Sequence, residues 1–132
     1  MLSSTKKLLR DNAYAIAIFA TFTIAFLSLA KLNGKVPSFN FSYDDKLKHS
    51  FAYFLLTLIW FFATDDIGAK KQKIRYILFV FICLYGLLME FLQQAFTDYR
   101  QADFFDALAN VTGVLIGFFS YDVLFKFLRK QF

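Results

Sequence analysis

The sequence predicts an all-helical integral membrane protein, a bundle of four transmembrane helices with both ends of the chain in the cytoplasm. Two observations predict this class: 58% of the 132 residues are hydrophobic and only 19% are charged, and the charges stand between long apolar runs. A small soluble domain needs polar residues to cover its surface. Because the apolar runs carry so little charge, lipid is the solvent that suits them.

The first expected helix covers about 12–30, where the chain after Asp11 runs without a charge over the roughly 20 residues that a bilayer crossing needs. Its length, and the lack of a clear small-residue cleavage site after it, indicate a retained helix rather than a signal peptide. Residues 31–44 contain Gly34 and the sole proline, Pro37, which is typical of a loop.

Three further helices are expected at about 45–64, 76–97 and 103–125. Asp44 and Asp45 stand at the start of the first of them, where carboxylates are favourable because they cap a helix N-terminus. The next follows a short basic stretch and is apolar over most of its length. No repeat or composition break divides the chain, so we expect a single transmembrane domain.

The lysines and arginines predict the orientation, because positive residues are retained on the cytoplasmic side of a membrane. Counted in alternate connections they split ten against five, so both termini are expected inside. They do not form one basic face, so we expect no nucleic-acid partner. One side holds Lys6, Lys7, Arg10, Lys70, Lys71, Lys73, Arg75, Lys126, Arg129 and Lys130. The other side holds Lys31, Lys35, Lys46, Lys48 and Arg100.

Polar side chains recur at helical spacing near the outer ends of the last three expected helices, so each set lies on one helix face. Ionisable residues within membrane segments face a bundle interior or a wet cavity and mark functional sites by default. We therefore expect these faces to meet in an outward polar cavity. The candidate ligand-binding residues are Asp45, Lys46, Tyr53, Gln93, Gln94, Arg100, Asp103, Asp106 and Asn110.

Two of the polar residues suit proton transfer, and they are the candidate catalytic pair. Glu90 is the only glutamate and lies about 10 Å inside its helix end, where desolvation favours the neutral acid. His49 is the only histidine, and the unperturbed pKa of an imidazole lies near neutral pH. The alternatives are a structural glutamate that ties helices together and an interfacial histidine bonded to Asp45 or Glu90.

We expect no metal and no cofactor, because one histidine with carboxylates is a thin ligand set and Cys83 is the only cysteine. Three glycines are assigned to helix packing instead. Gly113 and Gly117 form a GxxxG pattern, and Gly86 stands on the preceding helix. Small residues let helices approach closely, either within the bundle or at the seam of a homodimer.

The polar residues form four ordered blocks that together resemble the VanZ-like family. The resemblance implies a small bacterial protein of the cytoplasmic membrane, similar to one that raises resistance to the glycopeptide antibiotic teicoplanin; it implies no settled reaction. The blocks are Asp45-Lys46-x-x-His49-x-x-x-Tyr53, Glu90-x-x-Gln93-Gln94, Arg100 with Asp103, and Asp106-x-x-Ala109-Asn110-x-x-Gly113-x-x-x-Gly117.

Three functions remain open at this point. The leading hypothesis is that Lys46, His49 and Arg100 bind an anionic envelope component, either a membrane lipid or a cell-wall precursor or polymer. The second is a membrane enzyme in which His49 and Glu90 act as acid and base on a lipid-linked substrate. The third is a structural or accessory protein that docks a partner through Gly113 and Gly117.

Overall fold

The computed structural model describes residues 2–29, 44–96 and 104–131, and within them the chain is all-helical, as predicted. Five α-helices and one short 3-10 helix follow one another without a strand in these residues. They are α1 (Leu2–Asp11), α2 (Ala13–Leu29), α3 (Asp44–Ala63), η1 (Asp65–Lys70), α4 (Lys71–Phe96) and α5 (Phe104–Gln131).

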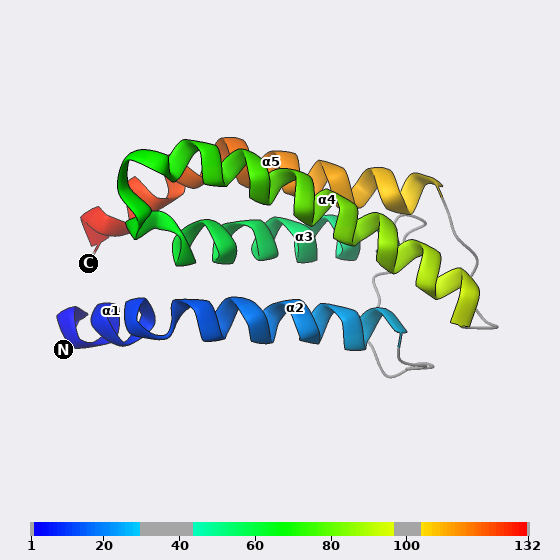
Figure 1. Cartoon of the computed structure of the whole chain (residues 1–132), viewed down its shortest axis with the longest axis horizontal. Coiled ribbons are helices and arrows are strands. Elements are labelled where there is room, and N and C mark those ends of the chain that lie inside the picture. The colour runs from blue at the N-terminus through cyan, green and yellow to red at the C-terminus, as the bar shows by residue number, and fades with distance from the viewer. Residues whose placement is uncertain (1, 30–43, 97–103, 132) are drawn as a thin grey trace.

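Helices α2 to α5 run alternately in opposite directions, so α3 and α5 begin at the same end of the molecule at which α4 finishes (Figure 1). The two chain termini and η1 lie together at the opposite end, which we call the terminal end (Figure 1). This alternation brings the first turns of α3 and α5 and the last turns of α4 to one place. Most of the residues singled out by the sequence fall there.

The helices extend further into charged sequence than expected. Leu2–Asp11 forms a separate helix that the sequence analysis missed, bent by 62° from α2. Helix α4 begins at Lys71 instead of near 76, and α5 continues to Gln131 instead of ending near 125. Lysine, arginine and glutamine are good helix formers, so a charged segment next to an apolar one can continue the helix.

Two helices are long and apolar enough to cross a membrane, Gly68–Ala95 and Phe104–Phe127, and the bent pair of α1 and α2 makes a third if it counts as one span. Helix α3 is not among these candidates. Its first turns carry Asp44, Asp45 and Lys46 and two further polar residues, which shorten its apolar part. Length and composition of the described helices thus indicate two or three spans.

Among the described helices, α3 and α5 are in the most extensive contact. A Cβ on Gly113 would overlap the backbone carbonyl of Ser50, and a Cβ on Gly117 would lie 2.9 Å from the Cβ of Thr57. Both glycines are therefore in contact with α3 of the same chain. The hydroxyl of Thr57 donates within its own helix to the carbonyl of Tyr53 at 2.8 Å, so this buried hydroxyl is satisfied at the contact.

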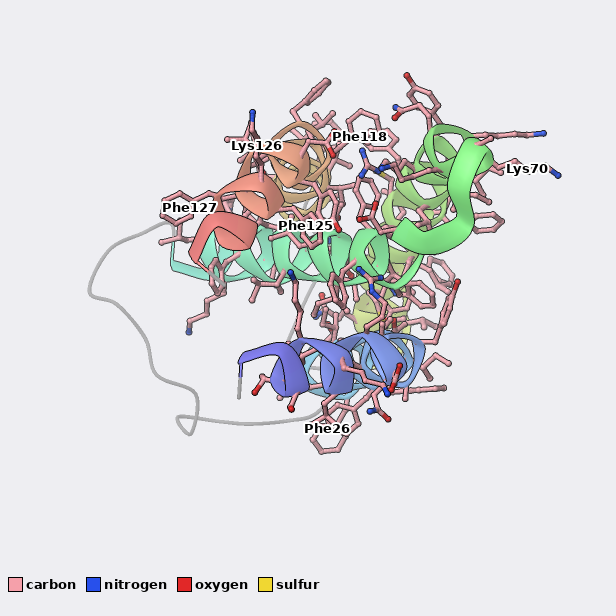
Figure 2. The ribbon with its side chains drawn as sticks, turned by 90° about the vertical axis from the view of Figure 1, so that its left-hand side faces the viewer. Phe26, Lys70, Phe118, Phe125, Lys126 and Phe127 are labelled. Atoms are coloured by element: carbon pink, nitrogen blue, oxygen red, sulfur yellow. The ribbon has the colours of Figure 1, made fainter. Side chains whose placement is uncertain are left out.

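Aromatic rings fill the space between the helices nearer the terminal end. Phe118 on α5 is labelled in Figure 2, and its ring lies 5.8 Å from that of Phe61 on α3, which is 0% exposed, and 5.6 Å from that of Phe79 on α4. Other phenylalanines face outward, and Phe26 on α2 points away from the other helices with 67% of its surface exposed (Figure 2). The chain thus has an aromatic interior and an aromatic exterior.

Helix α2 is tied to the others by polar side chains that bond to its backbone and hydroxyls. Tyr85 on α4 donates to the carbonyl of Thr21 at 2.5 Å, and Trp60 on α3 donates to the hydroxyl of the same threonine at 3.0 Å. Hydrogen bonds of this kind hold helices together where the surroundings offer no water. They fix the rotation of α4 and α3 relative to α2.

Candidate functional site

Four ionisable side chains from three helices meet where α3 and α5 begin and α4 ends, and we call them the polar cluster. Lys46 and His49 come from α3, Glu90 from α4 and Asp106 from α5. His49 Nδ1 lies 3.7 Å from Glu90 Oε1, and Lys46 Nζ lies 3.5 Å from Asp106 Oδ1. One nitrogen or oxygen from each of His49, Glu90 and Asp106 lies within 4.8 Å of the other two.

The polar cluster rests on two layers set one helical turn apart. One turn below it, Tyr53, Gly86 and Asn110 come from the same three helices. The lack of a side chain on Gly86 lets the other two approach, because a Cβ there would be 3.2 Å from Asn110 Cβ and 3.3 Å from Tyr53 Cε1. The cluster therefore has a floor. Beneath that floor the buried apolar layer consists of Leu56, Ile82 and Val114.

Burial differs across the cluster and shows where it opens. The side chains of Glu90 and Asp106 are 8% and 12% exposed, whereas the side chain of Lys46 is 29% exposed. The cluster is thus closed toward the helix interior and reached past Lys46. When the imidazole of His49 is neutral, the polar cluster holds one lysine and two carboxylates, so its net formal charge is −1. Protonation of His49 brings the net charge to zero.

The structure brings together six of the residues that the sequence singled out, and leaves two outside. Gln93 is buried but donates from Nε2 to the carbonyl of Ser28 on α2 at 2.8 Å, so part of its role is to join helices. Gln94 is exposed. Together at the cluster and its floor lie Lys46, His49, Tyr53, Glu90, Asp106 and Asn110. The side chain of Asp45 and the whole of Arg100 and Asp103 lie outside the described residues.

A second charged group, which the sequence analysis missed, lies at the terminal end, and we call it the terminal network. The guanidinium of Arg75 donates to Asp122 Oδ2 at 3.0 Å and to Asp65 Oδ1 at 3.3 Å, while only 5% of its side chain is exposed. Lys71 Nζ lies 3.4 Å from the same oxygen of Asp65. In the sequence, Asp122 is the signal that could have revealed this network, because a carboxylate inside an apolar helix needs a partner.

A hollow of about 320 Å³ also lies at the terminal end, between the first two helices and the ends of α3 and α5. Its lining is almost entirely apolar and includes Ala13, Ile59 and Phe62. Such a lining offers shape but few polar groups to fix the orientation of a ligand. The polar cluster, and not this hollow, is the candidate site.

Comparison with known proteins gives one informative relative. An uncharacterized protein of the fission yeast Schizosaccharomyces pombe is 32% identical over 105 residues, which cover 80% of this chain and 59% of that protein. The chain thus spans less than two thirds of the relative it matches. No protein-family model and no solved structure matches the chain.

These comparisons overturn the resemblance to the VanZ-like family. No family model matches, the relative is fungal, and nothing found indicates VanZ, a bacterial origin or teicoplanin resistance. The physical reason is that the four blocks consist of polar residues at intervals of three and four, the spacing that any polar helix face produces. What the chain is similar to is a eukaryotic protein of greater length.

Proposed function

We propose that the chain is a multi-pass membrane protein that binds the headgroup of a phosphate-bearing lipid at the polar cluster. One observation carries the proposal: three helices place ionisable side chains within 4.8 Å of one another, mostly buried, at the depth where the helices end. Ionisable groups at such a depth in a membrane protein mark binding or reaction sites. Helix ends are also where lipid headgroups lie.

The exposed surface supports placement in a bilayer. Phe19, Phe22 and Phe26 on α2 are 73%, 70% and 67% exposed, and Phe119 on α5 is 74% exposed. Water-soluble proteins rarely present apolar surface of this extent, whereas lipid tails solvate it. In this proposal α2 to α5 each cross the bilayer, and α3 crosses because its apolar part is flanked by the other helices.

The proposed orientation places the terminal end in the cytoplasm, following the ten-to-five split of lysine and arginine. The test uses Cys83→Ser protein carrying one new cysteine, in sealed vesicles treated with a membrane-impermeant maleimide. Ser4→Cys and Lys70→Cys are expected to be labelled from the cytoplasmic side, and Phe104→Cys from the other side. All three positions are exposed. Labelling of Phe104→Cys from the same side as Lys70→Cys would contradict the proposal.

A lipid headgroup fits the cluster better than a transported solute. The cluster opens past Lys46, whose ammonium binds phosphate as a point charge, and is closed below by the apolar layer. Leu56 and Val114 in that layer are 1% and 0% exposed, so they leave no polar route toward the terminal end. A ligand therefore enters and leaves by the same opening, and its apolar tails lie along the exposed faces of the helices.

The expected result is that Lys46→Gln protein binds phosphatidic acid about 10-fold more weakly than the unaltered chain, since a charge-assisted contact contributes about 1.5–3 kcal/mol. Binding is measured by native mass spectrometry in detergent. Diacylglycerol with the same tails serves as the ligand without phosphate. Lys73→Gln, an exposed position at the terminal end, is the matched control. Equal retention of both lipids by all three proteins would refute headgroup recognition.

The second candidate function is acid–base catalysis on a lipid-linked substrate, which the 3.7 Å separation of His49 Nδ1 and Glu90 Oε1 favours. The cluster itself contributes no hydroxyl or thiol nucleophile, so water or the substrate would supply one. Incubation of the protein with labelled lipids that carry cleavable headgroups tests this candidate. Headgroup release that is lost in Glu90→Gln protein would support it, and unchanged lipid would count against it.

A further inference from the structure

We infer that His49, Glu90 and Asp106 form a binding site for a divalent transition-metal ion of the zinc or manganese type. The sequence alone predicts no metal, because the types of ligand along the chain do not reveal which side chains three helices bring together. The inference goes beyond the proposed function. It rests on that function only where the ion is given a role in holding phosphate.

The first support is the spacing of the ligand atoms. Nitrogen and oxygen ligands lie about 2.0–2.2 Å from zinc, so two ligands of one tetrahedral ion are about 3.4 Å apart. His49 Nδ1 and Glu90 Oε1 are 3.7 Å apart, too long for an N–H···O hydrogen bond but close to that ligand spacing. An oxygen of Asp106 completes a triangle whose sides are all within 4.8 Å. Shifts of about an ångström bring all three onto one ion.

The second support comes from the floor of the cluster. Tyr53 and Asn110 are each only 3% exposed, and no residue in the described part of the chain forms a hydrogen bond with Tyr53 Oη or Asn110 Oδ1. Buried polar atoms are normally satisfied. Asn110 stands one turn below Asp106, where its carbonyl oxygen can serve as a further ligand. Tyr53 stands one turn below His49, where its hydroxyl can orient a ligand carboxylate.

The ligand set indicates the kind of ion. One imidazole with carboxylate and amide oxygens suits zinc or manganese better than copper(I), which prefers sulfur. Three ligands from the protein leave coordination positions open on the side of Lys46, as catalytic and substrate-binding metal sites do. A bound divalent ion changes the cluster's net charge from −1 to +1. Such a cluster attracts the phosphate of the proposed lipid.

Lys46 is the group that competes with the ion. Its ammonium lies 3.5 Å from Asp106 Oδ1, and its side chain is partly exposed, so it can turn outward when the ion binds. Removal of Lys46 therefore raises metal affinity, whereas removal of a ligand lowers it. Opposite effects of neighbouring substitutions distinguish a metal site from a network with a purely structural role.

The experiment titrates zinc and manganese into purified full-length protein without added lipid, against a fluorescent chelator of known affinity. Three variants each remove one ligand: His49→Ala, Glu90→Gln and Asp106→Asn. Each is expected to lower metal affinity by more than roughly 10- to 100-fold, which is the loss caused by removing an outer-shell partner. Lys46→Gln is expected to bind about 10-fold more tightly, because one like charge is gone. Asp11→Asn, an exposed carboxylate on α1, is the matched control.

Two comparisons keep the result independent of folding and of the lipid proposal. A gain in metal affinity in Lys46→Gln protein cannot come from misfolding. The rise in thermal midpoint that the metal causes in the unaltered chain is measured as a second sign of binding. Phosphatidic acid binding is then measured with the ion and with EDTA. Metal binding without lipid binding would overturn the proposed function alone. Lipid binding without metal binding, or equal metal affinity in all variants, would overturn the metal site.

Discussion

Gly113→Leu protein is expected to lose the contact between α3 and α5 and to yield little folded material. A Cβ at this position overlaps the carbonyl group of Ser50, which belongs to the backbone and cannot turn aside as a side chain can. Overpacking of a well-packed interior costs about 1–3 kcal/mol even where side chains can adjust. Because α3 and α5 carry two of the three sides of the polar cluster, separation of these helices also dissolves the candidate site.

The measurement is the thermal midpoint and the monodisperse fraction in detergent, and the chain offers a close control. Thr112→Leu places the same side chain one residue earlier on an exposed face of α5, where the threonine bonds only within its own helix among the described residues. It is expected to leave the midpoint unchanged. Gly117→Ala is expected to be milder than Gly113→Ala, since it meets the side chain of Thr57. Equal midpoints for Gly113→Leu and Thr112→Leu would show that the helices are not packed this closely.

The sequence predicted the helical class and the common depth of the candidate residues because both follow from local rules. An apolar run long enough to cross a bilayer predicts a helix. Residues at intervals of three and four along that helix lie on one face. His49, Glu90 and Asp106 each stand near the end of their helix, so a bundle of alternating helices brings them to one depth. No knowledge of packing was needed for that step.

The rotation of each helix could not be predicted in the same way. Gln93 and Gln94 are adjacent and equally polar, yet only Gln93 is buried, because α4 turns that side toward the carbonyl of Ser28. Arg75 was counted only as a signal of orientation, yet it is 4% exposed. Which side of a helix meets a neighbour depends on the shapes of both helices, and one sequence read segment by segment does not contain that information.

Arg75→Met is expected to destabilise the protein by about 3 kcal/mol, the lower end of the range for breaking a buried ion pair. The substitution removes the nearer of the two cationic partners of Asp65, whose side chain is only 12% exposed. Lys71 stays 3.4 Å away and offsets part of the loss. The partner on α5, Asp122, has 73% of its side chain exposed and so contributes less. Arg75 also lies 4.9 Å from the ring centre of Tyr121. Loss of this contact adds to the cost.

Three further variants separate charge from packing at the terminal network. Arg75→Lys is expected to recover only part of the stability, because an ammonium cannot hold two carboxylates with a planar fork. Arg75→Met combined with Asp65→Leu is expected to recover more, since no buried charge is then left unpaired. Lys73→Met, exposed on the same helix, should match the unaltered chain in thermal midpoint. If the thermal midpoint of Arg75→Met protein also equalled that of the unaltered chain, the buried Arg75 would contribute nothing to stability. The contact between α4 and α5 would then depend on the aromatic contacts of Phe118 instead.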